Sequence, residues 1–327
     1  MTTYVAGSEV EILSSFNGTV STDSRIAVSG VNRAGFQFVG TGQTGVLNFT
    51  GVTEGWFHFR AASINNDAGV ANVVQATARL RNSTDQTLVT FNRGTQTLTQ
   101  WQVQILSQPV VEVSGNEADW DIHFKIDPTV GFVRVYRNQA LVTSFEGAVQ
   151  FASGTQEVSR FFMTSVSALS GISTRATGYS QLLCSSDPTL GARVHTLPLS
   201  AGSVNTWATG TVTDINDTAD TPGTFIATDT NGDEILFEMG DISGLLAGNG
   251  IRALVMSTSS QTLGGSPVTN QRGRVKLGAT TYDMGAAVAP GTGFKRVQHI
   301  LDLDPATTLP WVVADINAAE IGLKAET

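Results

Sequence analysis

Alternation between hydrophobic and polar residues is the dominant pattern along the chain, and it predicts β-strands. The segment 120–126 places Trp120, Ile122, Phe124 and Ile126 on one side and polar residues on the other. The same alternation predicts further strands at 46–50, 55–60, 74–81, 87–91, 101–105, 131–136 and 141–145. Short polar turns separate them. Short strands at this spacing are typical of an antiparallel β-sandwich.

The pattern breaks near residues 197–202, and we place a domain boundary between Leu197 and Pro198. Beyond it, Asn231-Gly232 predicts a hairpin that joins strands at 225–229 and 234–239, because both residues tolerate a positive φ. Further strands are predicted at 251–256, 273–277 and 295–301.

The period changes near the end of the chain. Apolar residues from Val312 to Leu323 recur at helical spacing, which predicts a short helix from about 313 to 324. We expect its apolar face to pack on the second domain, with a tryptophan anchoring its start. A competing interpretation makes this helix an assembly element, buried only against a neighbouring protein. The predicted packing or assembly residues are Trp311, Val312, Ile316, Ala319 and Leu323.

These patterns predict an all-β fold of two antiparallel β-sandwich domains, both of the jelly-roll kind. The first domain covers residues 1–197, and the second covers residues 198–327 and ends in the short helix. A chain of 327 residues is long enough for two cores of this size.

Charge argues against nucleic acid as a partner. Charged residues make up 14% of the chain, against roughly 25% in an average soluble protein, and the formal net charge is −9. Binding to DNA or RNA through phosphate neutralisation needs clustered Lys and Arg, which this chain lacks. The first domain carries 12 basic and 14 acidic residues and the second 7 and 14, so the acidic character belongs to the second domain.

Low surface charge also predicts self-association, because surfaces rich in Thr, Gln and Asn carry little electrostatic protection against neighbours. We therefore expect the chain to associate with copies of itself. No apolar run is long enough for a membrane-spanning helix, so we expect no membrane insertion. The N-terminal residues carry no secretory pattern, and Cys184 has no cysteine partner, so we expect folding in a reducing cytoplasm.

The run from Asp121 to Gly147 resembles the laminin-G or concanavalin-like jelly roll. A strand ends in Ile126-Asp127-Pro128, a second strand follows at 131–136, and a short turn leads to 141–147. In those domains the middle strand leads into an Asp-Gly turn, whereas Asn138-Gln139 stands in that place here. The resemblance implies a sandwich and names no ligand.

A second resemblance covers most of residues 120–327. Its motifs, in order, are Asp187-Pro188-Thr189-Leu190-Gly191-Ala192-Arg193-Val194, Asn205-Thr206-Trp207, Asp304-Pro305-Ala306-Thr307, and the run from Trp311 to Lys324. This order is similar to a family of tailed-bacteriophage virion proteins, which join a laminin-G-like sandwich to a second β-domain. The chain departs from it at Thr308, where Gly is usual, and at Val312, where Thr is usual.

The resemblance implies a non-enzymatic structural component of a tailed-phage virion, in the tail, fibre, collar or head decoration. Its implied partners are copies of itself, in a symmetric homo-oligomer with a trimer favoured, and neighbouring tail, collar or capsid proteins. Its implied location is the virion, after synthesis in the host cytoplasm. A second hypothesis is a receptor-binding, lectin-like adhesin that attaches to host surface glycan. A third is a glycan-cleaving enzyme.

Paired carboxylates are the residues that glycan cleavage would need. Glu117, Asp119 and Asp121 alternate along one strand, but the next required position holds Ile122. The sequence therefore disfavours the enzyme, and these acids are interpreted as a solvated strand end. No Gly-x-Ser-x-Gly motif anchors a serine hydrolase, so we expect no catalytic residue and no enzyme activity.

We expect no cofactor and no bound metal. The weak calcium candidates are the oxygen-bearing residues Asp214, Asn216, Asp217 and Asp220. The four histidines are scattered and share no metal-ligand spacing, and Cys184 is expected to be a buried small hydrophobe. Trp56, Trp101 and Trp120 lie in alternating strands, so core packing is favoured for them over stacking on sugars.

Overall fold

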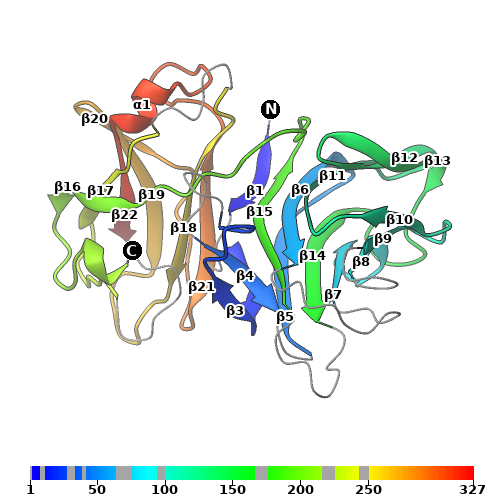
Figure 1. Ribbon diagram of the computed structural model, residues 1–327. Helices are drawn as coiled ribbons and strands as arrows, with labels where there is room; N and C mark the ends of the chain where they lie inside the picture. The colour runs from blue at the N-terminus through cyan, green and yellow to red at the C-terminus, as the bar shows by residue number, and fades with distance from the viewer. Residues whose placement is uncertain are drawn as a thin grey trace. The chain divides into compact units, whose positions relative to one another are not determined.

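The computed structural model describes residues 2–7, 12–27, 34–38, 42–63, 76–93, 100–165, 176–215, 225–242 and 250–327. The chain divides into two compact units, residues 2–195 and 196–327. The regular secondary structure of each is almost entirely antiparallel strand (Figure 1). The prediction of an all-β fold of antiparallel sandwiches with a short helix near the C-terminus is confirmed.

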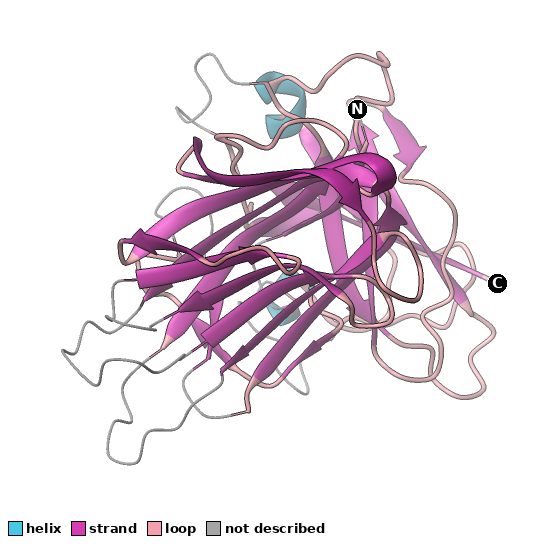
Figure 2. Cartoon of the chain, turned by 90° about the vertical axis from the view of Figure 1, so that its right-hand side faces the viewer, coloured by secondary structure: helices cyan, strands magenta, loops and turns pink. Residues whose placement is uncertain are grey.

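The first unit contains two large sheets, which Figure 2 shows as two layers of strands. The eight-stranded sheet has the order β13 (Ala140–Val149), β12 (Asp127–Arg137), β11 (Glu117–Lys125), β6 (Glu54–Ser63), β15 (Thr177–Ser185), β4 (Gly35–Phe38) and β3 (Thr19–Ser21), with β1 (Thr3–Gly7) also pairing with β15. The seven-stranded sheet has the order β10 (Val111–Ser114), β9 (Gln100–Ile105), β8 (Thr87–Arg93), β7 (Ala76–Arg81), β14 (Val158–Ser165), β5 (Thr44–Val52) and β2 (Ser15–Phe16).

Aromatic side chains from both sheets fill the space between the layers. The ring of Phe57 on β6 lies 4.7 Å from that of Phe161 on β14, and Phe59 lies 5.1 Å from Phe91 on β8. All four rings are fully buried. Burial of such a side chain contributes roughly 1.5–3 kcal/mol. This core holds the two sheets together and leaves their opposite faces for other contacts.

The second unit contains a five-stranded and a two-stranded sheet. The larger has the order β16 (Leu199–Asn205), β17 (Glu234–Met239), β22 (Ala319–Glu326), β19 (Asn270–Leu277) and β20 (Thr280–Asp283), and the smaller pairs β18 (Leu254–Ser260) with β21 (Lys295–Leu301). Two short helical segments accompany them, the 3-10 helix η2 (Val212–Asp214) and α1 (Val313–Asn317). A separate core joins the sheets and includes Ile235, Phe237, Met256 and Val275.

Trp311 lies in this second core. Its side chain is 2% exposed, and its indole Nε1 donates a hydrogen bond to the Leu301 carbonyl at 2.9 Å. Ile316, Ala319 and Leu323 are buried in the same cluster. Val312 is 53% exposed, so its predicted packing is wrong. The reason is that Val312 is the extended residue before α1 and does not share the helix face.

The predicted helix over 313–324 is wrong beyond Asn317. Residues 319–326 form β22, which pairs with β17 on one side and β19 on the other. Buried Ala319, Ile321, Leu323 and Ala325 recur with the two-residue period of a strand. Two of the helically spaced apolar positions, Ala319 and Leu323, also fit this shorter period. Hydrogen bonding to β17 on one edge and to β19 on the other stabilises this segment as a strand.

The predicted hairpin between 225–229 and 234–239 is also wrong. A turn does form, with Gly232 at a φ of 92°, but β17 pairs with β16 and β22 instead. Ala227 forms an isolated bridge with Thr209. Because long-range pairing occupies both edges of β17, the local Asn-Gly signal could not place its partner strand.

None of the helices in the described part of the chain has the length and apolar character needed to cross a membrane.

Candidate functional site

Three neighbouring strands of the first unit present polar and aromatic side chains on the face opposite the core. On β6 the residues Phe57 and Phe59 point into the core, so alternation places their neighbours on the opposite face of the sheet. Register pairs His123 with Trp56, and Asp121 with both His58 and Tyr136. We call this surface of β6, β11 and β12 the outer face. Its side chains are Trp56, His58, Arg60, Glu117, Asp119, Asp121, His123, Phe132, Arg134 and Tyr136.

An aromatic cluster occupies one part of the outer face. The rings of Trp56 and His123 are nearly parallel, with centroids 4.1 Å apart, and Trp56 lies 5.7 Å from Tyr136. Phe132 meets His123 edge to face at 4.5 Å. Trp56 is 7% exposed, whereas the other three side chains are half-buried. The cluster therefore combines a covered tryptophan with three rings that reach solvent.

Charged groups flank these rings. The Arg134 guanidinium lies over the Phe132 ring, 4.7 Å from its centroid, and donates a 2.7 Å hydrogen bond to Glu146. Burial, together with the nearby charge of Arg134, lowers the pKa of His123 to about 4. At neutral pH the His123 imidazole is therefore uncharged. The cluster thus offers a neutral imidazole, aromatic rings, one guanidinium and one carboxylate.

A buried polar group lies beside the aromatic cluster. His58 Nδ1 lies 2.9 Å from Asp121 Oδ1, and the Thr189 hydroxyl donates to the same oxygen at 2.7 Å. All three residues are fully buried. Thr189 belongs to the segment 186–195 that follows β15, so this group fixes that segment on the outer face. The sequence interpretation of Asp121 as part of a solvated strand end is wrong, because Thr189 arrives from 68 residues along the chain.

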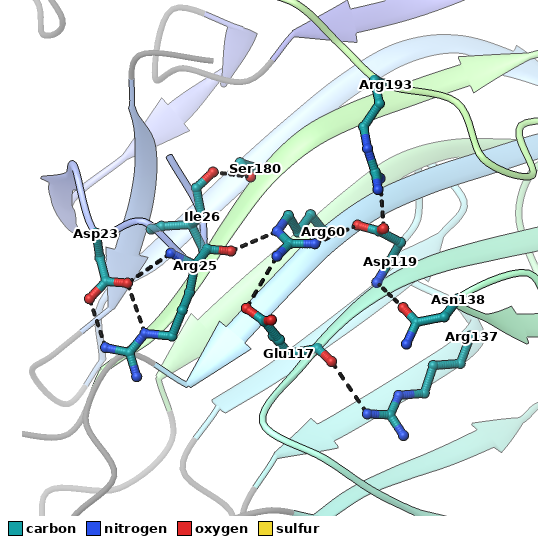
Figure 3. A network of polar contacts seen from close by, with 10 residues as sticks. All are labelled: Asp23, Arg25, Ile26, Arg60, Glu117, Asp119, Arg137, Asn138, Ser180 and Arg193. Atoms are coloured by element: carbon teal, nitrogen blue, oxygen red, sulfur yellow. Dashed lines mark hydrogen bonds and ion pairs between the residues drawn. The ribbon is translucent and has the colours of Figure 1, made fainter. Parts of the chain in front are cut away.

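An arginine and carboxylate network continues the outer face (Figure 3). Arg60 donates to Asp119 at 3.0 Å and to Glu117 at 3.2 Å, and Arg193 donates to the second oxygen of Asp119 at 2.6 Å. Burial alone would raise the pKa of Asp119, but the hydrogen bond and charge of Arg193 hold it below its ordinary value. A carboxylate kept ionised in this way is suited to an ion pair and not to donating a proton.

The same network reaches the loop that follows β3. Arg60 Nε donates to the Arg25 carbonyl at 2.6 Å, and Ser180 donates to the Ile26 carbonyl at 2.8 Å. Arg25 forms a two-point ion pair with Asp23 (Figure 3). Asp119 is therefore an interior member of a charge network, which corrects its interpretation as a solvated strand end. Glu117 remains more exposed at 50% of its side chain.

The tryptophans predicted to pack in the core divide between two faces. Trp101 and Trp120 are fully buried between the sheets, as predicted. Trp56 is buried as well, but on the outer face, against His123. Sequence reasoning did not single out His123, Phe132, Arg134 and Tyr136. Their signal was the alternation itself, which puts polar and aromatic residues of 120–126 and 131–136 on one face.

Of the calcium candidates, only Asp214 lies in the described part of the chain; Asn216, Asp217 and Asp220 lie outside it. Asp214 Oδ2 accepts hydrogen bonds from the backbone and hydroxyl of Thr211, which caps η2. Among the described residues no group of three or more His, Cys, Asp or Glu could hold a metal ion. Cys184 is fully buried, as predicted, and burial raises the pKa of its thiol.

Comparison with known proteins gives distant structural similarities. No protein-family model and no curated protein sequence matches the chain. A sialidase of Trypanosoma rangeli is 15% identical, with a TM-score of 0.33, over 56% of this chain and 30% of the sialidase. The alginate lyase Aly36B is 8% identical, with a TM-score of 0.31, over 49% of this chain and 82% of the lyase. A tetrameric galectin from the ball sponge Cinachyrella sp. is 13% identical, with a TM-score of 0.28, over 42% of this chain and 98% of the galectin.

Proposed function

We propose that this chain is a non-enzymatic binding protein of a tailed-phage virion, and that its first unit attaches to a glycan through the outer face. The observation that carries the glycan proposal is the aromatic cluster of Trp56, His123, Phe132 and Tyr136. Three of these rings are half-buried on a sheet that is already stabilised by a complete core on its other side. Because that core already stabilises the sheet, folding does not require aromatic residues at these positions of the outer face.

The chemistry of the cluster suits a saccharide. Aromatic rings pack against the C–H groups of a sugar ring, and a few polar groups fix its orientation. Arg134 supplies donors and Glu146 supplies acceptors next to Phe132, and both side chains are exposed enough to meet hydroxyl groups. The neutral His123 imidazole adds one donor and one acceptor.

Binding without cleavage is favoured by the state of the carboxylates. Retaining and inverting glycosidases use one carboxylic acid that donates a proton. Asp119 is paired with two arginines, and Asp121 is buried under Thr189. Neither is placed to protonate a leaving group on a bound sugar. An adhesin is the function that these contacts favour.

The virion setting is supported by the motifs at 187–194, 205–207, 304–307 and 311–324, which resemble tailed-phage structural proteins. Assembly through the second unit is the second candidate function. The exposed large apolar side chains of that unit favour it: Phe225, Leu263, Phe294, Leu303, Leu309 and Val312. Such residues are common at interfaces that are covered on assembly. The proposal includes a symmetric homo-oligomer, with a trimer favoured.

A glycan array probed with the purified full chain tests the adhesin directly. We expect binding to a limited set of saccharides, with the highest-affinity one also blocking adsorption of the protein to host cells. An array with no bound saccharide, together with no adsorption to cells, contradicts the adhesin. Electron microscopy of virions labelled with an antibody against this chain tests the setting: the label should decorate an appendage, and unlabelled particles contradict the virion proposal.

A further inference from the structure

Two arginine–tryptophan pairs face the interior of the first unit, one on each sheet. Arg93, the last residue of β8, is the cross-strand partner of Trp101, and its guanidinium lies 5.4 Å from that ring. Arg137, the last residue of β12, is the cross-strand partner of Trp120 and lies 6.0 Å from its ring. The two tryptophan rings are 5.8 Å apart. Both guanidinium groups therefore lie at the same end of the sandwich, between the two sheets.

Neither guanidinium has a carboxylate partner within the described ranges. Arg93 donates to the Gln100 carbonyl at 3.0 Å and to the Asn116 side chain at 3.5 Å. Arg137 donates to the Ser114 and Glu117 carbonyls (Figure 3 shows the second contact). Neutral acceptors do not offset the cost of burying a charge, and Arg93 is only 1% exposed.

Buried donors without a partner gather around the same pairs. They are Arg93 Nε, Arg137 Nε, Trp101 Nε1, Trp120 Nε1 and the Tyr179 hydroxyl. Burial raises the pKa of Tyr179, so its hydroxyl keeps its proton and remains a donor. Buried donors in folded proteins are rarely left unpaired, and each costs about 1–3 kcal/mol when it is. An excess of donors at one place calls for a ligand rich in acceptors.

Electrostatics points to an anion. Burial and the nearby charge of Arg137 together lower the pKa of Arg93 to about 10, against an opposing effect of Tyr179. Two like charges that face the same space disfavour each other unless a negative charge lies between them. The turn after β10 is shaped to bring Arg137 in, because Gly115 has a φ of 129° and a Cβ there would overlap the guanidinium.

We propose that this end of the first sandwich is an oxyanion site, in which Arg93 and Arg137 bind a carboxylate or sulfate group. The planar guanidinium fork pairs with both oxygens of such a group, and the tryptophan N–H groups and the Tyr179 hydroxyl supply further donors. The half-buried Arg137, beside the exposed Ser114, is the side from which the anion enters. The site lies on the core side of β11 and β12 and does not depend on the glycan site of the outer face.

Thermal unfolding of the full chain with added anion tests this proposal. The probes are sulfate and glucuronate, with chloride at matched ionic strength and uncharged glucuronamide as references. A ligand that binds only the folded state raises stability as RT ln(1 + [L]/Kd), so a specific site gives a saturable shift in Tm. Nonspecific salting effects grow without saturation and act on every variant alike.

Arg137→Gln is the diagnostic variant, because Arg137 is half-buried and its replacement keeps the core intact. We expect it to weaken anion binding about tenfold or more, with Arg137→Lys intermediate because it keeps the charge and loses the fork. Arg160→Gln is the matched control, because Arg160 lies on β14 of the same unit, pairs with Asp85 and belongs to neither proposed site. It should bind the anion like the unmodified protein.

The outcomes separate the ligand sources. Saturable stabilisation by both anions that Arg137→Gln weakens supports a general oxyanion site, and stabilisation by glucuronate alone assigns the site to an acidic saccharide. No saturable effect of either anion overturns the proposal. So does an effect of equal size in the unmodified protein and Arg137→Gln. If Arg137→Gln fails to fold, Gly115→Ala, which displaces the Arg137 guanidinium, is measured instead and judged by the same criteria.

Discussion

The imidazole of His58 and the carboxylate of Asp121, cross-strand neighbours on β6 and β11, form a fully buried pair 2.9 Å apart on the face opposite the core. Such a pair is normally found inside a core or a catalytic site. Here the segment 186–195 covers it and contributes Thr189 as a third member. One part of the outer face is therefore covered and polar, and the part with the aromatic cluster is open to solvent.

Thr189→Val removes the hydroxyl that donates to buried Asp121 and keeps the side-chain shape. We expect the free energy of unfolding to fall by about 1–3 kcal/mol, because a buried carboxylate loses a partner. Urea unfolding followed by tryptophan fluorescence measures it. Thr129→Val is the matched control, since the Thr129 hydroxyl also donates to an aspartate, Asp127, but in solvent. Equal losses of unfolding free energy in the two variants would show that the buried hydrogen bond contributes no more to stability than the exposed one.

His123 makes the stability of the first unit depend on pH. Its pKa is about 4 in the folded protein, against the ordinary value of 6.5 in the unfolded chain. Between these values the unfolded chain binds a proton that the folded protein does not, so stability decreases as pH falls from about 6.5 to about 4. His123→Phe keeps a ring and removes the titration. Its urea midpoint should fall less than that of the unmodified protein over this range, and parallel curves would contradict the assignment.

Gly322→Ala distinguishes the strand β22 from the helix that periodicity predicted. In a helix interior this change stabilises by roughly 1 kcal/mol. In β22 the new Cβ overlaps the Ile235 carbonyl of β17, so we expect a loss of roughly 1–3 kcal/mol from forced separation of the strands. Gly250→Ala, where a Cβ meets open space, is the control. A more stable Gly322→Ala protein in chemical unfolding would favour the helix.

Trp311→Ala removes a large side chain from the second core together with its hydrogen bond to Leu301. We expect a loss of roughly 3–5 kcal/mol for the second unit. Leu309→Ala, two residues earlier and 62% exposed, should change stability by less than about 0.5 kcal/mol. Differential scanning calorimetry measures both. If the two variants melt alike, Trp311 does not belong to the folded core of the isolated chain and the assembly interpretation of this segment gains support.

Alternation predicted most strands of the first unit because one face of each strand is buried and the other is polar. It did not indicate which face lies in the core where both faces of a strand are covered. On β6 both Trp56 and Phe57 are apolar and covered, so the pattern could not show that they belong to different faces. A second limit applied to 313–324, where a two-residue and a helical period share Ala319 and Leu323.

Long-range contacts account for the other errors. Nothing in the strand of Asp121 indicates that Thr189 covers it, or that Arg193 pairs with Asp119 from 74 residues away. The partners of β17 were equally remote. A usable signal did exist for the outer face: His58, Arg60, Asp119 and Asp121 interrupt strands that are otherwise apolar, at alternate positions. That spacing is enough to place them on one surface of a sheet.

The most direct test of the account is the affinity of the full chain for the best saccharide from the array, measured by calorimetry in three variants. Phe132→Ala and Tyr136→Ala each remove a half-buried ring of the outer face, and Phe294→Ala removes an exposed ring of the second unit as a control. We predict that each of the first two weakens binding about tenfold or more, equivalent to roughly 1.4 kcal/mol, while Phe294→Ala leaves it unchanged. Unchanged affinity in both Phe132→Ala and Tyr136→Ala would contradict the placement of the glycan on this face.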